Sequence, residues 1–379
     1  RDLLNVKIMG FNAIRFIAGV ATRYQLDLCD ELGLMVYEES YAGWCLADSP
    51  KMAERFDRST AEMLRRDRNH PSVVIWGLLN ETSDGPVFRH AVNMLPLIRS
   101  LDNSRMILLG SGRWDCQLDI GSICNPGSTV WEHTLGDERP EAEPSKMLWG
   151  GYCERVGDAH AYPRVPHLPE TIQFLRTVGH DSKGHVFLSE YGIGSAVDLW
   201  RVTRHYEQLG KASVEDAQFY RDQLERFLVD WERWNMAETF NHPADYFLQF
   251  LRKMAGQRLL GLNALRANPH LIGYSLTGTV DQGMTGEGLT TTFREFKPGT
   301  IDALADGLAQ LRWCTFVEPV NIYRGASVRL EAVLANEDVL TPGEYPVRLQ
   351  VERSGMVGTA CTRVFDRTIT VTIPDQNRK

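Results

Sequence analysis

Short apolar runs alternate with longer amphipathic stretches along most of the chain. The short runs predict strands at residues 12–17, 34–39, 73–79, 106–110, 159–162, 186–189 and 271–276. The amphipathic stretches predict helices at residues 24–32, 51–66, 88–101, 214–234, 245–267 and 301–311. Alternation of strand and helix is typical of parallel βα units. We therefore predict an α/β fold, a (β/α)8 TIM barrel, whose first strand is expected upstream of Arg1.

Two regions depart from this period. Residues 115–157 are rich in Gly, Pro, Trp and Cys and predict a long loop over the active face of the barrel. After residue 312 hydrophobicity alternates with a period of two, at residues 327–334, 345–351 and 362–373, as in antiparallel strands. The predicted domains are a catalytic barrel at 1–311 and a β-sandwich-like domain at 312–379. The second is shorter than the roughly 100 residues of a whole sandwich, so we expect it to be incomplete.

Composition narrows the class of protein. The chain is 43% hydrophobic with a net charge of −8, which is typical of a soluble globular protein and not of a nucleic-acid-binding one. No apolar run reaches the roughly 20 residues of a membrane helix, so we expect no membrane contact, and the compartment stays open with the cytoplasm favoured. The seven cysteines are scattered without a C-x-x-C pair, which predicts reduced thiols.

Acidic residues follow three of the predicted strands. Glu81 comes after the run at 73–79, Glu190 after the run at 186–189, and Glu39 ends the run at 34–39. Active sites of parallel barrels lie at the carboxyl ends of the strands. Two carboxylates meeting there suit hydrolysis of a glycosidic bond, with retention of configuration if they lie about 5–5.5 Å apart. We also expect a negative Glu190 to raise the pKa of Glu81 and keep it protonated.

A strand-end glutamate taken alone is more often a helix cap or the partner of an arginine. The sequence around these residues favours a catalytic role instead, because residues 68–81, RNHPSVVIWGLLNE, resemble the acid/base signature of glycoside hydrolase family 2. That family contains β-galactosidases, β-glucuronidases and β-mannosidases. Further matches follow in order: GFNAIR at 10–15, LCDELGL at 28–34, DAHAYP at 158–163 and SEYG at 189–192. The resemblance covers roughly residues 1–311.

The resemblance implies a role for each matched residue. Glu81 corresponds to the acid/base and Glu190 to the nucleophile, while Asn80 corresponds to the ligand of the sugar 2-hydroxyl. The expected substrate-binding residues are Asn80, Arg15, Tyr162, His160, Glu39 and Asp158. For Glu39 a structural salt bridge is an equally good interpretation. The resemblance also implies upstream β-sandwich domains and no cofactor, and a homo-oligomer is compatible with it.

Departures from the family pattern bear on the substrate. Thr277 stands where the family often has a tryptophan beneath the sugar, so another aromatic residue is needed, and the candidates are Trp44, Trp114, Trp131 and Trp149. Glucuronidases of the family carry Asn-x-Lys shortly before a Lys-Pro pair, whereas this chain has Glu287-Gly288-Leu289 before Lys297. A neutral sugar such as a β-galactoside is therefore favoured over a uronic acid.

The expected function is that of a retaining exo-β-glycosidase, a hydrolase acting on carbohydrate. Alternatives are a β-glucuronidase or β-mannosidase of the same family, an endo-acting barrel glycosidase, a catalytically silent carbohydrate-binding barrel and a metal-assisted hydrolase. No H-E-x-x-H or comparable metal-ligand spacing occurs, although His160, His167 and Glu170 lie near one another in sequence. We therefore expect no metal.

Overall fold

The structure is a computed structural model, which describes residues 1–116, 120–133, 157–180, 185–283, 285–353 and 362–375. The chain divides into two compact units, Arg1–Leu308 and Ala309–Lys379. Sequence reasoning placed this boundary three residues later, at 311. Within the described residues, no helix is both long and apolar enough to cross a membrane.

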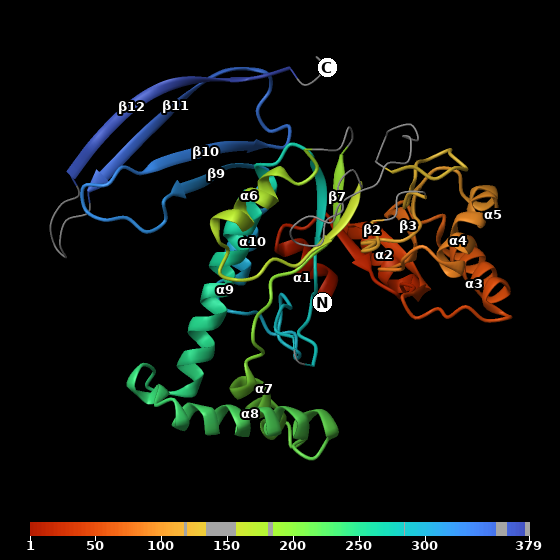
Figure 1. Cartoon of the computed structure of the whole chain (residues 1–379), viewed down its shortest axis with the longest axis horizontal. Coiled ribbons are helices and arrows are strands. Elements are labelled where there is room, and N and C mark those ends of the chain that lie inside the picture. Colours follow the sequence, from red (N-terminus) through yellow and green to blue (C-terminus); the bar gives the residue numbers. More distant parts are fainter. Residues whose placement is uncertain (117–119, 134–156, 181–184, 284, 354–361, 376–379) are drawn as a thin grey trace. The chain divides into compact units, whose positions relative to one another are not determined.

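The first unit contains all seven strands predicted for the barrel, of which β2, β3 and β7 are labelled in Figure 1. They are β1 (Ala13–Phe16), β2 (Met35–Gly43), β3 (Val73–Leu79), β4 (Met106–Leu108), β6 (Asp158–Ala161), β7 (Val186–Tyr191) and β8 (Leu271–Leu276). A short β5 (Ile123–Cys124) pairs antiparallel with β4. The sheet orders are β1-β2-β3-β4-β5 and β6-β7-β8, and all other pairings within these two sheets are parallel. Consecutive strands are therefore neighbours, as in a barrel.

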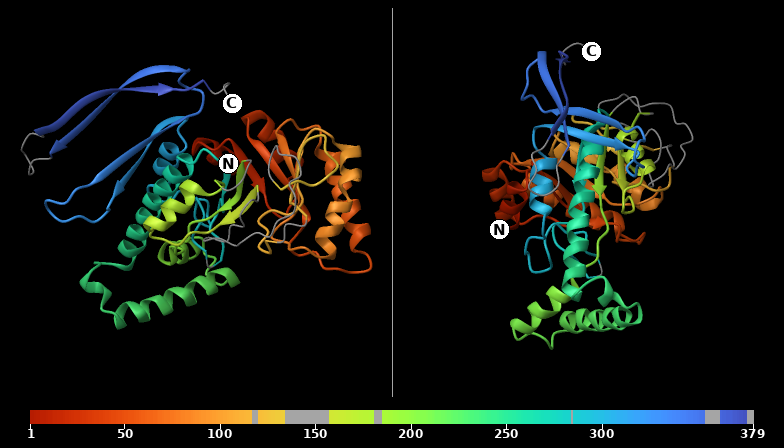
Figure 2. Two further views of the ribbon diagram at one scale, coloured as in Figure 1. Left: turned by 45° about the horizontal axis from the view of Figure 1, so that its top comes forward. Right: turned by 90° about the vertical axis from the view of Figure 1, so that its left-hand side faces the viewer.

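Helices alternate with these strands as the amphipathic pattern predicted. The unit contains α1 (Asp2–Ile8), α2 (Arg23–Leu32), α3 (Met52–Asp67), α4 (Pro86–Asn93), α5 (Leu95–Leu101), α6 (Pro169–Thr177), α7 (Leu199–Gln208), α8 (Glu215–Arg233), η2 (Met236–Glu238), α9 (Pro243–Arg266) and α10 (Thr300–Gly307). The helix α9 runs from α6 and α10 at one end to α7 and α8 at the other (Figure 2).

Local chemistry explains the sharpest of these boundaries. At the start of α2, the Thr22 hydroxyl accepts from the Gln25 backbone N–H and the Gln25 side chain accepts from the Thr22 backbone N–H, which is a capping box. At its end, Gly33 adopts the left-handed conformation that glycine accepts without strain. Helix α3 then buries Phe56 and Leu64 against the strands. These caps and the apolar face fix the first βα units.

Two helix predictions need correction, and two helices were missed. The predicted helix at 88–101 is divided into α4 and α5 around Met94, where Pro96 lies at the start of α5, because proline has no N–H for a continuous helix. The predicted helix at 301–311 ends at Gly307, and Leu311 already begins β9. Helices α6 and α7 were not predicted.

Cysteine usage also differs from the prediction. Cys29, Cys45, Cys124 and Cys314 are free, as expected, whereas Cys116 is disulfide-bonded. Scattered spacing gave no sign of that bond, because a disulfide depends on proximity in the fold rather than in the sequence. Cys153 and Cys361 lie outside the described residues, as does most of the predicted long loop.

The second unit contains β9 (Leu311–Glu318), β10 (Arg329–Asn336), β11 (Gly343–Arg353) and β12 (Thr362–Ile373). β9 pairs antiparallel with β10, and β11 with β12. The predicted strands at 345–351 and 362–373 fall within β11 and β12, whereas the strand predicted at 327–334 begins two residues later and ends two residues later, as β10. In the described part of this unit the strands form two separate two-stranded sheets, and the sandwich stays a prediction.

Candidate active site

The polar residues named from sequence gather at the carboxyl ends of the barrel strands. Arg15 lies near the end of β1, Glu39 in β2, Glu81 just after β3, His160 in β6 and Glu190 in β7. Because parallel strands end at one face, five segments far apart in sequence bring their side chains to one place. The hydrogen bonds between these side chains describe the site.

Arg15 is the centre of this network. Its side chain is only 5% exposed. Nη1 donates to Oε1 of Glu190 at 2.9 Å and to the Ser189 carbonyl at 2.9 Å, and the guanidinium also binds Glu39 through Nε and Nη2. Burial alone would lower the pKa of Arg15, but the charges of Tyr37, Glu39 and Glu190 raise it above its ordinary value. A permanently charged group therefore holds one oxygen of Glu190.

Asn80 joins the network through its carbonyl oxygen. Oδ1 accepts from Nη2 of Arg15 at 2.7 Å and from the Ser111 hydroxyl at 2.8 Å. The Ser111 hydroxyl lies 2.9 Å from Nη2 of Arg15 as well. Because Oδ1 accepts two hydrogen bonds, the orientation of the amide is fixed, and its NH₂ group has no acceptor among the described parts of the chain.

The second oxygen of Glu190 faces a tyrosine and a histidine. The Tyr162 hydroxyl donates to Oε2 of Glu190 and lies 3.2 Å from the Thr277 hydroxyl. Nδ1 of His160 lies 3.3 Å from the same Oε2. Burial and then the negative Glu190 raise the pKa of Tyr162, so the phenol stays protonated and remains a donor. Glu190 is thus oriented from two sides.

Glu81 occupies a strained position directly after β3. Its φ is 48°, in the left-handed region that non-glycine residues rarely adopt and that recurs at functional sites. Its backbone N–H donates to the Ser111 carbonyl at 2.7 Å. Its carboxylate binds Nδ1 of His160 at 2.8 Å, and the Trp114 side chain also donates to it. The side chain is 33% exposed, compared with 7% for Glu190.

The expectation of a raised pKa for Glu81 is wrong. The hydrogen bond from His160 outweighs burial, and the pKa of Glu81 is lowered from its ordinary value. Sequence reasoning considered only the charge of Glu190, because the contact between Glu81 and a histidine is a property of the fold. In this arrangement the charged form of Glu81 is favoured by a donor in direct contact.

The two glutamates and His160 form a tight cluster. One ligand atom from each of the three residues lies within 4.8 Å of the others. The two carboxylates are therefore close enough to act on the same bond. The same three atoms could also hold a metal ion, which sequence spacing did not suggest, since the residues come from three separate strands.

Two glycines allow this close packing. Gly112 has φ +63°, and a Cβ there would overlap the His160 ring. A Cβ on Gly192 would overlap the Tyr162 ring. Asp158 supports the first of these positions, because its Oδ2 accepts from the Gly112 backbone N–H at 2.6 Å. Asp158 is buried, which raises its pKa, and its predicted role in substrate binding stays a prediction.

The tryptophan residues considered as the aromatic surface beneath the sugar lie in different places in the structure. Trp114 lies at the site, with its ring edge-on to His160 at 6.5 Å between centroids. Trp131 packs against His133 instead, Trp44 is 55% exposed, and Trp149 lies outside the described residues. Thr277 is at the site beside Tyr162, and Trp114 is the one of the described tryptophan candidates that contacts a glutamate of the site.

Sequence reasoning missed Ser111 altogether and treated Glu287 only as a departure from a motif. Ser111 follows β4, and its carbonyl and hydroxyl contact Glu81 and Asn80. A serine after a predicted strand is too common to be singled out. Glu287 lies in the segment after β8, with its Oε2 2.8 Å from the position that a Cβ on Gly192 would take. Its position after the last strand was the one signal that could have identified it.

Part of the chain is similar to known proteins. Residues 1–147 match the model of the glycosyl hydrolases family 2, TIM barrel domain. A putative β-glucuronidase of Formosa agariphila is 36% identical over 131 residues, which cover 33% of this chain and 12% of that protein. The β-galactosidase BgaC of Bifidobacterium adolescentis is 36% identical over 193 residues, covering 44% and 18%. The chain matches less than a fifth of the length of either relative.

The fold is similar to that of a solved enzyme. The β-D-mannosidase of Dictyoglomus thermophilum aligns with a TM-score of 0.55 and 15% identity over 98% of this chain and 43% of that chain. At this identity the likeness shows the fold alone. The part of this chain that is similar to the glycosyl hydrolases of family 2 is thus residues 1–147, which match their TIM barrel domain.

Proposed function

We propose that the chain is a retaining exo-β-glycosidase that cleaves terminal β-linked sugars, with a neutral sugar such as a β-galactoside preferred. The observation that carries this proposal is the approach of Glu81 and Glu190, since one carboxylate oxygen of each lies within 4.8 Å of the other. Retaining glycosidases place their carboxyl groups about 5–5.5 Å apart, whereas inverting ones leave about 6.5–9.5 Å for a water molecule. The shorter spacing suits direct attack by a carboxylate.

In the first step Glu190 attacks the anomeric carbon, and the bond from that carbon to the leaving oxygen breaks as Glu81 delivers its proton to that oxygen. Arg15 holds Oε1 and Tyr162 holds Oε2 of the nucleophile. Such fixed donors keep the attacking carboxylate in place without reorganisation. The product is a glycosyl ester on Glu190, and the aglycone leaves with the proton.

In the second step Glu81 removes a proton from water, whose oxygen attacks the anomeric carbon and breaks the ester to Glu190. Nδ1 of His160 lies 2.8 Å from Glu81 and 3.3 Å from Glu190. It is therefore close to whichever of the two glutamates carries the negative charge at each step. The lowered pKa of Glu81 suits this base role. Asn80, with its amide NH₂ free to donate, supplies a ligand for the sugar 2-hydroxyl.

Replacement of Glu190 by alanine tests the proposal. Glu190→Ala removes the nucleophile, so we expect turnover of an aryl β-galactoside to fall by about 10⁴-fold or more. Added azide should restore part of the turnover by occupying the vacated position and should give a glycosyl azide. Glu170→Ala, an exposed glutamate in the first turn of α6, is the matched control and should keep native turnover. Native turnover by Glu190→Ala without azide would contradict the proposal.

A metal-assisted hydrolase is the second candidate, because Glu81, His160 and Glu190 could hold an ion between them. In that case the metal would supply the activated water, and a covalent intermediate would not be needed. Dialysis against a chelator separates the two candidates. The glycosidase proposed here should keep its turnover, whereas a metal-assisted enzyme should lose it and regain it with added divalent ion.

A further inference from the structure

Glu287 brings a third carboxylate to the two proposed catalytic glutamates. It lies in the segment after β8, at the carboxyl face of the barrel where β7 presents Glu190. Its Oε2 lies 2.8 Å from the position that a Cβ on Gly192 would occupy, and that same position overlaps the Tyr162 ring. Glu287 therefore flanks Tyr162, the residue that donates to Glu190, and the negative charge of Glu287 contributes to raising the pKa of Tyr162.

Buried charges hold the backbone on both sides of Glu287. Arg258 of α9, which is 1% exposed, donates through Nη2 to the Glu287 carbonyl. Nζ of Lys297 donates to the Gly286 carbonyl at 2.6 Å and pairs with Asp281. Oδ1 of Asp281 accepts from the Gly288 backbone N–H at 3.0 Å. Residues 286, 287 and 288 are thus each tied to a buried side chain, which sets the direction of the Glu287 side chain in advance.

The carboxylate of Glu287 has no hydrogen-bond donor among the residues that the structure describes. It is half-buried, and burial followed by the negative Glu190 raises its pKa, against the opposing effect of Arg258. A carboxylate that is partly removed from water and lacks a donor is an acceptor available to a ligand. A second anion placed between Glu287 and Glu190 would meet the negative charge of both carboxylates.

We propose that Glu287 is a specificity-determining residue, which accepts a hydrogen bond from a hydroxyl or ammonium group of the bound sugar and excludes sugars that present a carboxylate there. This inference rests on the proposed glycosidase function and adds the class of sugar that the site accepts. A hydroxyl or ammonium supplies the missing donor, whereas a uronic acid would place two like charges together.

The test compares kcat/KM for an aryl β-galactoside, an aryl β-glucosaminide and an aryl β-glucuronide. The native chain should favour the galactoside over the glucuronide by about 100-fold or more. Glu287→Gln keeps the shape and removes the charge, so this ratio should fall by roughly tenfold. Glu287→Lys should lower the ratio further by attracting the uronate. If the glucosaminide is the best substrate, the bound donor is the ammonium; if the galactoside is, the donor is a hydroxyl.

Asp302→Asn is the matched control, since it removes an exposed acidic charge on α10 and should leave all three values unchanged. Circular dichroism checks that each variant is folded, and the isosteric Glu287→Gln carries the test if Glu287→Lys does not fold. If Glu287→Gln keeps the native ratio of kcat/KM for the galactoside to that for the glucuronide, and turnover still depends on Glu190, this inference is overturned. The glycosidase proposal would then still stand. Absence of turnover on every sugar, together with no covalent adduct on Glu190, would overturn both.

Discussion

The two ends of strand β3 use charged residues in opposite ways. At its amino end each charged side chain meets an opposite charge or a backbone carbonyl. At its carboxyl end Glu81 adopts a strained conformation close to Glu190. The motif at 68–81 spans both ends of β3. Its residues before the strand take part in ion pairs and backbone contacts, whereas Glu81 after the strand lies in the candidate active site.

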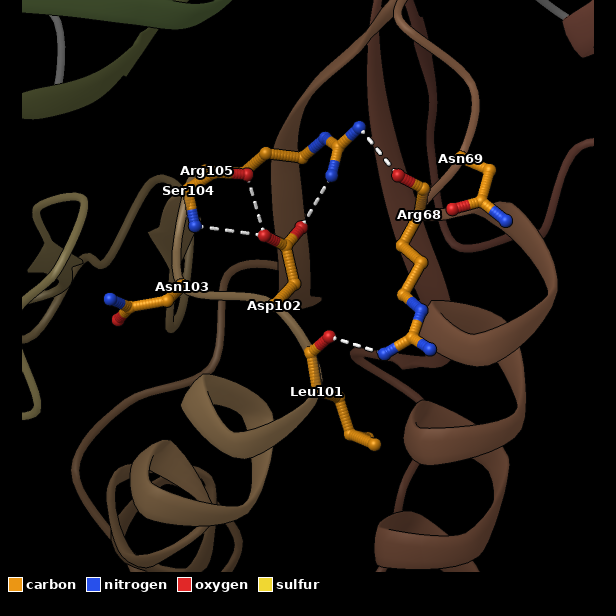
Figure 3. Close-up of a pocket in the computed structure, with 7 residues that line it drawn as sticks. All are labelled: Arg68, Asn69, Leu101, Asp102, Asn103, Ser104 and Arg105. Carbon is orange, nitrogen blue, oxygen red and sulfur yellow. Dashed lines mark hydrogen bonds and ion pairs between the residues drawn. The ribbon is translucent and has the colours of Figure 1, made fainter.

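Figure 3 shows the amino end, where residues before β3 and β4 line a surface cavity of about 400 Å³. Arg105 pairs with Asp102 at 2.6 Å and donates to the carbonyls of Arg68 and His70. Arg68 in turn donates to the Leu101 carbonyl at 2.7 Å. These contacts join the loops that precede neighbouring strands, so their contribution is to stability.

On the proposed function, the carboxyl end serves chemistry at the expense of stability. Like charges are brought together there, and the φ of Glu81 costs on the order of 1–3 kcal/mol. Arg15 offsets part of this cost by binding Glu39 and Glu190. We therefore expect substitutions at the carboxyl end to change turnover and substitutions at the amino end to change the free energy of unfolding.

Glu81→Gln should give the largest effect at the carboxyl end. Loss of the general acid should lower kcat/KM by about 10²–10⁴-fold for substrates with poor leaving groups, and by less for a nitrophenyl glycoside that needs no proton. In the native enzyme kcat/KM should fall as the pH rises through the pKa of Glu81, which lies below its ordinary value. The variant should lose this limb of the pH profile. An equal loss on good and poor leaving groups would remove Glu81 from the acid role.

Asp102→Asn should give the largest effect at the amino end. The side chain of Asp102 is 4% exposed and pairs with Arg105, so removing its charge should lower the free energy of unfolding by on the order of 3 kcal/mol, with turnover per folded molecule unchanged. Urea unfolding followed by circular dichroism measures this loss. Asn103→Ala, an exposed neighbour in the same loop, is the control and should change little.

The contribution of Asp102 should also depend on pH. Burial alone would raise its pKa, but hydrogen bonds from Ser104, Trp76 and Arg105 lower it below the ordinary value. A depressed pKa means that the stability is present above the ordinary aspartate pKa of about 4 and is lost as the pH falls toward the folded value. The native chain and Asp102→Asn should therefore converge in stability in acid.

Gly112→Ala should have smaller effects, on both turnover and the free energy of unfolding. The new Cβ would overlap His160, so kcat/KM should fall by roughly tenfold and the free energy of unfolding by about 1–3 kcal/mol. Gly127→Ala is a matched control, because Gly127 also has a positive φ, +78°, but nothing lies within 4 Å of its added Cβ. A loss of turnover in Gly127→Ala equal to that in Gly112→Ala would show that backbone strain alone, and not the position of His160, is responsible.

The sequence predicted the strands of the barrel well, because each is an apolar run between polar turns. It missed α6 and α7, since α6 buries only Thr171 and Leu175, and α7 only Val202 and Thr203. Two buried positions give too weak a stripe to stand out from a loop.

The site was predicted as far as its residues follow strands or match the family motifs. Glu81 and Glu190 fall into both groups. Ser111 and Glu287 lie in connecting segments, where position in space depends on the whole fold. The lowered pKa of Glu81 could not be foreseen either, because it depends on the 2.8 Å contact with His160, and hydrogen bonds between distant segments leave no local pattern.

The most direct test of the central claim is the mass of the intact protein after incubation with 2-fluoro glycosides of galactose, glucuronic acid and mannose. These compounds form slowly hydrolysed esters on the nucleophile of a retaining enzyme. The account predicts one adduct per chain, on the peptide that contains Glu190, with the galactoside reacting fastest and no adduct on Glu190→Ala. An adduct on another carboxylate, or none from any sugar on folded protein, would contradict it.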